Sequence, residues 1–103
     1  MRQHVLDLCD QHEIEIEWID RGGWAARELD LIQIPPIRSA ISYAVALHEI
    51  GHICGRYQTS KAQTVRERWA WVWAREKAVK WTASMDRKAR ASLVYAARAG
   101  GGA

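Results

Sequence analysis

The sequence contains little that would mark a secreted, membrane-spanning or fibrous protein. Its two cysteines are too few for a disulfide-rich scaffold, and they form no Cys-x-x-Cys pair. No apolar run approaches the about 18 residues of a membrane-spanning helix, and the N-terminus has no secretory signal pattern. The composition, with seven glycines and two prolines, excludes collagen and low-complexity chains. We therefore expect a soluble cytoplasmic protein that does not enter a membrane.

The length of the chain limits how much structure it can hold. Its 103 residues suffice for one small domain. A domain of this size buries only a modest share of its surface, so its stability is marginal without a further element such as a bound metal ion. Cys9 and Cys54 are expected to be small buried hydrophobic residues, because a disulfide would be unusual in the cytosol.

The net charge of +3 is unevenly distributed along the chain. Residues 1–52 carry four arginines against nine acids, a balance of −5, whereas residues 53–103 carry eleven basic residues against three acids, a balance of +8. A basic half could bind nucleic acid or an acidic protein. The charge pattern alone favours the simpler interpretation, which is a set of solvated helix faces.

The first third of the sequence predicts a helix followed by a small sheet. Apolar residues at near-helical spacing indicate a helix over 1–12. Between 13 and 19, apolar residues alternate with glutamates, which predicts a strand with an acidic outer face. A change of phase at 28–34 predicts a bulge. With the double-glycine turn at 22–23, these segments predict a small, mainly antiparallel sheet over 13–34.

The remaining sequence predicts three helices, and with them an α+β fold. Pro35-Pro36 ends the sheet region because neither residue can donate to a strand ladder. Residues 39–54 are apolar on nearly all sides, which is typical of a buried helix, and Gly55 stands where a left-handed C-terminal cap belongs. Two further helices are expected, a long one rich in tryptophan and a last one capped by Ser84, over 62–83 and 85–98.

The buried helix contains the motif His48-Glu49-Ile50-Gly51-His52. Residues four apart share one face of a helix, so both imidazoles can reach a single cation. Glu49 projects about 100° round the helix and in such sites addresses a metal-bound water. Two imidazoles and one carboxylate suit Zn²⁺ with a fourth position left for water. Polar groups are costly inside an apolar helix unless they are paired, which favours a metal site over isolated core histidines.

Three side chains are candidates for the third ligand. Gln58 occupies the position of the third histidine in the metzincin pattern, but its amide is a poor zinc ligand. Glu76 pairs with Lys80 at the spacing of an ordinary surface ion pair. Glu67 lies in an apolar helical stripe, where a carboxylate needs a metal or a cation, and we favour it. Small residues on the same stripe predict a close approach to the histidine-bearing helix, namely Ala70 and Ala74.

Two motifs together resemble the ImmA/IrrE family of zinc metallopeptidases. The first is Leu47-His-Glu-Ile-Gly-His52, and the second is Glu67-Arg-Trp-Ala70-Trp-Val-Trp73-Ala74. The similarity covers residues 13–81, and the second motif is the more specific of the two. The resemblance is to a short, stand-alone form from a phage or bacterium. It implies a small zincin-like domain in which Glu49 is the catalytic glutamate and the zinc ligands are His48, His52 and Glu67.

The same resemblance bears on partners. Proteins of this family are cytosolic, and some cleave repressors of the helix-turn-helix type, so a transcriptional repressor is one implied substrate. The chain departs from the family pattern at Arg75-Glu76-Lys77, where an apolar segment is usual. A fused DNA-binding domain, common in the family, is not expected here. The sequence gives no signal for an oligomeric state.

The expected function is zinc-dependent hydrolysis of a peptide bond in a specific protein target. Glu49 would act as general base on a zinc-bound water, and the substrate would lie as an extended strand along the sheet edge. Nothing in the sequence selects an oxyanion-stabilising residue among Tyr43, Arg56 and Tyr57. The alternative is a zinc-stabilised, non-catalytic module that uses its basic C-terminal half to bind DNA or an acidic protein, with nucleic acid the less favoured partner.

Overall fold

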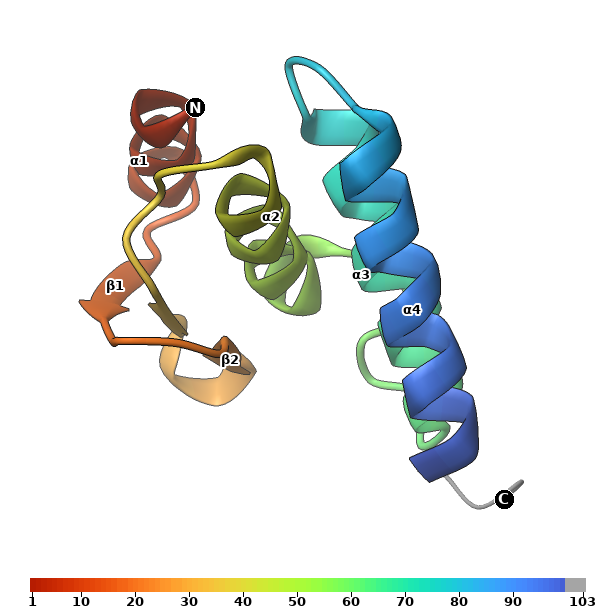
Figure 1. Cartoon of the computed structure of the whole chain (residues 1–103). Coiled ribbons are helices and arrows are strands. Elements are labelled where there is room, and N and C mark those ends of the chain that lie inside the picture. Colours follow the sequence, from red (N-terminus) through yellow and green to blue (C-terminus); the bar gives the residue numbers. More distant parts are fainter. Residues whose placement is uncertain (100–103) are drawn as a thin grey trace.

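A computed structural model describes residues 1–99 and has an α+β architecture in which one helix lies between a sheet and a helical pair (Figure 1). The central helix α2 contacts α1 and the sheet on one side and α3 and α4 on the other. The expected α+β class is confirmed. The elements in chain order are α1 Arg2–Gln11, β1 Glu15–Trp18, β2 Trp24–Ala26, β3 Leu31–Ile34, α2 Ala40–Cys54, α3 Gln63–Lys77 and α4 Ala83–Ala99.

The sheet is mixed, not mainly antiparallel as expected. Its strand order is β1-β3-β2, with β3 parallel to β1 and antiparallel to β2. The chain leaves β1, forms the edge strand β2 and returns between the two, so β3 runs in the same direction as β1. Ile32 and Ile34 of β3 are fully buried, while Glu15 and Glu17 give the sheet the acidic outer face that the alternation predicts.

The change of phase before β3 is not a bulge. Arg27–Leu29 form a short 3-10 turn, and Asp30 follows in the left-handed region with φ of 48°. The Asp30 carbonyl accepts a hydrogen bond from the backbone N–H of Glu15 at 2.8 Å. The turn therefore resets the side-chain alternation and at the same time joins β1 to the start of β3.

Helix α2 is buried along most of its length, as its uniformly apolar sequence predicts. Ser39 caps its N-terminus: its Oγ accepts from the backbone N–H of Ser42, whose own hydroxyl contacts the Ser39 N–H in return. The C-terminal cap differs from the prediction. Gly55 is extended, with φ of −72° and ψ of 165°, and glycine is needed there because a Cβ would collide with the Gly51 carbonyl oxygen.

The helices expected over 62–83 and 85–98 are present as α3 and α4, but the first ends earlier than predicted, because residues 78–82 are not helical. α3 ends at Lys77, and α4 begins at Ala83 and runs back antiparallel along α3 (Figure 1). A residue of α2 stabilises the segment between α3 and α4: the Tyr43 hydroxyl accepts a hydrogen bond from the Val79 N–H at 3.1 Å. Thr82, not Ser84, caps α4 by accepting from the Met85 N–H at 3.3 Å.

Two further findings concern the cysteines and the length and apolar character of the helices. Cys9 is buried, Cys54 is half-buried, and both are free thiols. None of the helices formed by residues 1–99 combines the length and the apolar character needed to cross a membrane.

Candidate metal centre

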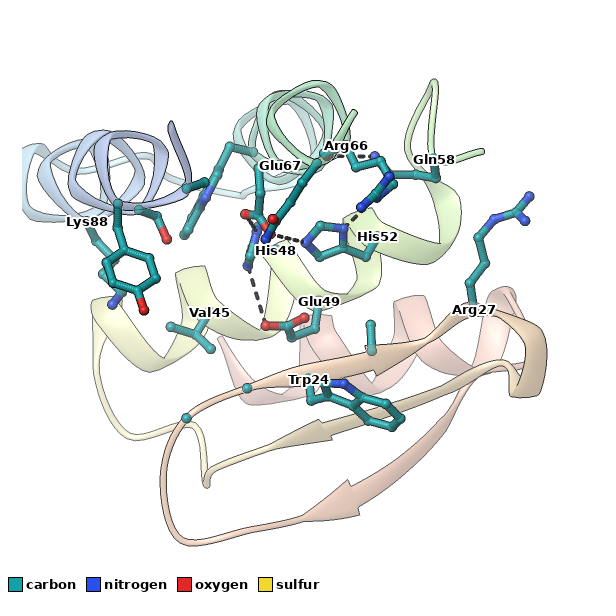
Figure 2. A pocket seen from close by; sticks show the side chains of 18 of the residues that line it. Trp24, Arg27, Val45, His48, Glu49, His52, Gln58, Arg66, Glu67 and Lys88 are labelled. Carbon is teal, nitrogen blue, oxygen red and sulfur yellow. Dashed lines mark hydrogen bonds and ion pairs between the residues drawn. The ribbon is translucent and has the colours of Figure 1, made fainter. Parts of the chain in front are cut away.

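His48, His52 and Glu67 converge on one point between α2 and α3 (Figure 2). Their ligand atoms all lie within 4.8 Å of one another, so the group could hold a metal ion. The Glu67 carboxylate reaches both imidazoles, with Oε2 at 2.8 Å from His48 Nε2 and Oε1 at 3.0 Å from His52 Nε2. The histidines share a face of α2 because they are four residues apart.

The convergence depends on how closely the two helices pack. A Cβ built on Gly51 would lie 2.5 Å from the Ala70 carbonyl oxygen and 3.0 Å from the Ala70 Cα. Ala70 and Ala74 are fully buried at this contact. The close approach predicted from these small residues therefore exists, and it brings the turn of α3 that carries Glu67 over the two histidines.

The donor set fits a divalent transition metal. Two imidazole nitrogens and one carboxylate are the protein ligands of many catalytic zinc centres, which leave a fourth position for water or substrate. Imidazole also suits copper, iron and nickel, so the group by itself does not fix the identity of the metal. Structural zinc sites normally have four protein ligands, and the group found within residues 1–99 has three.

Electrostatics at the site couple the histidines to acidic neighbours. Burial acts to lower the pKa of His48, but the carboxylates of Glu49 and Glu67 outweigh it and raise that pKa to about 9. Burial acts to raise the pKa of Glu67, but hydrogen bonds from His48 and His52 outweigh it and lower that pKa to about 2. Without a metal, hydrogen bonds between the two imidazoles and the Glu67 carboxylate therefore hold the group together.

Trp71 fixes the plane of the first histidine. Its indole stacks on the His48 ring, with centroids 4.2 Å apart and planes 12° from parallel. Its Nε1 is the one buried side-chain nitrogen or oxygen without a hydrogen-bond partner among residues 1–99. Trp71 follows Glu67 by one helical turn, so α3 supplies both a candidate ligand and the surface against which the imidazole rests.

Glu49 lies outside the three-residue group and faces the sheet (Figure 2). Its side chain is buried, and Oε2 is 3.4 Å from His48 Nδ1. On its other side the carboxylate meets Gly23, just before β2: a Cβ built there would lie 2.7 Å from Glu49 Oε2 and 2.9 Å from Val45 Cγ1. Gly23 is thus the residue that leaves room for the Glu49 carboxylate next to His48 Nδ1.

The group opens into a cleft of about 1070 Å³. One wall is formed by the segment from Asp20 to Glu28, which includes β2, and the other by α3 and α4. Figure 2 shows Trp24 and Arg27 on the sheet side and Lys88 on the helical side. Sequence reasoning missed the α4 wall, because nothing in the spacing of that helix indicates that it folds back beside the histidines.

The other predicted candidates lie elsewhere. Glu76 is exposed near the end of α3 and takes no part in the group. Gln58 contacts His52 Nδ1, the imidazole nitrogen that does not face Glu67. None of the three residues considered for oxyanion stabilisation lines the cleft, namely Tyr43, Arg56 and Tyr57.

Comparisons with protein-family models, with curated proteins and with solved structures find no significant match to this chain. The resemblance to the ImmA/IrrE family therefore rests on the two sequence motifs alone. What the site can do has to be argued from its own geometry.

Proposed function

We propose that this protein is a zinc-dependent peptidase that hydrolyses a peptide bond in a specific protein target. The observation that carries the proposal is the convergence of His48, His52 and Glu67 on the floor of an open cleft, with Glu49 beside them. A metal ion bound only to stabilise the fold would not need a cleft next to its open coordination position. The three-residue donor set also favours a catalytic over a structural centre.

The residues around the centre have distinct parts in this reaction. Bound zinc would supply a Lewis acid and lower the pKa of the attacking water towards about 7. Glu49 accepts the proton of that water and delivers it to the leaving amine. Its buried carboxylate is confined between His48 Nδ1 and Gly23, which limits the positions from which it can act. His48 is itself oriented by its stack on Trp71.

The substrate is best accommodated as an extended chain along β2. This strand forms one edge of the described sheet and borders the cleft. An extended peptide can add to such an edge through backbone hydrogen bonds, which would carry its scissile bond past Glu49. Trp24 of β2 is 53% exposed and offers an apolar contact on this wall. By the family resemblance, a repressor in the cytoplasm is one candidate target.

The first experiment measures the metal content of the purified protein by elemental mass spectrometry. We expect one zinc per chain in the wild type and in Glu76→Ala, which serves as the matched control on the same helix. We expect loss of zinc in His48→Ala and Glu67→Ala. Zinc retained in Glu67→Ala would contradict the ligand assignment, and absence of zinc from the wild type after zinc-supplemented purification would overturn the proposal.

The second experiment tests catalysis. Wild type and Glu49→Gln, both loaded with zinc, are incubated with a bacterial proteome digest, and newly formed peptide termini are identified by mass spectrometry. We expect cleavages at a narrow set of sites with the wild type and their loss with Glu49→Gln. An identical set of termini in both samples, or none in either, would favour the non-catalytic module, for which salt-dependent retention on DNA is the corresponding test.

A further inference from the structure

The carboxamide of Gln58 makes three hydrogen bonds that connect the two helices of the metal centre. Gln58 is buried in the loop between α2 and α3. Its Nε2 donates to the carbonyl oxygens of Arg66 and Arg56, at 2.9 and 3.2 Å, and its Oε1 lies 3.0 Å from His52 Nδ1. One side chain thus contacts a candidate ligand on α2 and the residue before Glu67 on α3.

The two carbonyl contacts fix which way the amide points. A backbone carbonyl can only accept a hydrogen bond, so the amide nitrogen, with its two N–H donors, must face Arg56 and Arg66. The flipped amide would set its oxygen against two carbonyl oxygens. Gln58 Oε1 therefore faces His52 because of the backbone around it, independently of the state of the histidine.

An amide oxygen, in turn, fixes the proton on the histidine. Oε1 can only accept, so His52 Nδ1 must carry a hydrogen. Nε2 faces Glu67 and, while no metal is bound, donates a hydrogen bond to its carboxylate. When a cation takes the place of that proton, the lone pair of Nε2 is the one available to it. We propose that Gln58 is a positioning residue that holds His52 as the Nδ1–H form, so that Nε2 is directed to the metal.

This role rests on the proposed metal centre but not on peptidase activity. Partners of this kind behind a metal-binding histidine fix its ring orientation and strengthen it as a ligand. His48 has a different arrangement, because its Nδ1 faces the carboxylate of Glu49. Gln58 is thus the neutral group that orients the second histidine without adding a further charge to the site.

The test compares Gln58→Met, which keeps the approximate volume and removes all three hydrogen bonds, with Gln63→Met. Gln63 is exposed on α3, so its variant is the matched control. Zinc affinity is measured by competition with a chromophoric chelator. We expect affinity to fall by roughly 10- to 100-fold in Gln58→Met and to remain unchanged in Gln63→Met.

A second readout separates positioning from simple structural support. The chain has four histidines, so long-range ¹H–¹⁵N spectra of ¹⁵N-histidine protein can be assigned by single substitutions. We expect zinc-loaded wild type to show His52 with Nδ1 protonated and Nε2 bound, and Gln58→Met to lose this single form. An unchanged His52 pattern in Gln58→Met, or a wild-type Nδ1 without a proton, would overturn the role of Gln58.

Failure of the peptidase proposal can be distinguished from failure of the role proposed for Gln58. If the wild type binds no zinc, both proposals fall, because each rests on the metal centre. If zinc binds and no peptide is cleaved, the affinity and spectra above are unaffected. Once zinc binding is shown, the two proposals therefore succeed or fail on separate measurements.

Discussion

Gly51 of α2 lies directly against the backbone of Ala70 in α3, and this contact sets the distance between the two halves of the candidate metal centre. The glycine falls between His48 and His52, and Ala70 follows Glu67 by three residues. Any side chain at position 51 would have to displace backbone atoms of the neighbouring helix. The glycine of the motif is therefore a packing requirement of this site.

Replacing this glycine tests that relationship. Gly51→Ala places a methyl group 2.5 Å from the Ala70 carbonyl oxygen, so the helices must separate. We expect the free energy of unfolding of the metal-free protein, from urea denaturation, to fall by about 1–3 kcal/mol, and zinc affinity to fall as well. Because the obstruction is backbone, adding Ala70→Gly should not restore either quantity. Wild-type values in Gly51→Ala would contradict the packing argument.

The pKa shifts at the site predict how the stability of the metal-free protein depends on pH. The folded pKa of His48, about 9, lies above the ordinary 6.5, so its contribution is complete below pH 6.5 and is lost as pH rises to 9. The folded pKa of Glu67, about 2, lies below the ordinary 4.5, so its contribution is complete above pH 4.5 and is lost as pH falls to 2. Stability from this pair is therefore greatest between pH 4.5 and 6.5.

Urea denaturation in the presence of a chelator measures this dependence. Between pH 6.5 and 9 we expect the free energy of unfolding to fall by on the order of 1–3 kcal/mol. The control is His48→Gln, which should flatten this alkaline limb. An equally steep decline in His48→Gln would assign the pH dependence to other groups.

The local parts of this site could be predicted from the sequence, and the long-range parts could not. His48 and His52 share a face by helix geometry alone, and an apolar stripe indicated Glu67. Gln58 could be compared with a third-ligand position, but its contact with His52 depends on where the loop meets the Arg66 carbonyl. No spacing rule reports such a contact.

In the fold, too, the local features could be predicted from the sequence and the long-range contacts could not. The helix boundaries of α1 and α2 follow from apolar spacing and from the cap at Ser39. The end of α3 does not, because it is held by a hydroxyl from α2, 36 residues earlier in the chain. The parallel pairing of β1 with β3 likewise depends on a strand order that alternation cannot specify.

Tyr43 offers a test of that long-range contact. Its buried hydroxyl is hydrogen-bonded to His4 Nδ1 at 2.6 Å and accepts from the Val79 N–H, so Tyr43→Phe leaves both groups without a partner. We expect a loss of about 1–2 kcal/mol in the free energy of unfolding and faster hydrogen exchange at the Val79 amide. Zinc affinity should not change, because Tyr43 does not contact the centre. Tyr95→Phe, at a position 75% exposed, is the control and should have little effect.

A substitution at Gly23 distinguishes metal binding from catalysis. A methyl group at this position would lie 2.7 Å from Glu49 Oε2 and 2.9 Å from Val45 Cγ1, so both side chains must shift and the carboxylate leaves its confined position. We expect Gly23→Ala to retain its zinc, as measured by elemental mass spectrometry. Cleavage of a peptide identified with the wild type should slow by about 10- to 100-fold, because the general base is displaced.

The neighbouring glycine supplies the control. Gly22 has φ of 86° and open space around its Cβ position, so Gly22→Ala strains the backbone without touching Glu49. We expect Gly22→Ala to lose some stability and to keep its rate of cleavage. Equal loss of rate in both variants would mean that the turn, and not the position of the Glu49 carboxylate, limits the reaction. Full activity in Gly23→Ala would remove Glu49 from the catalytic role proposed for it.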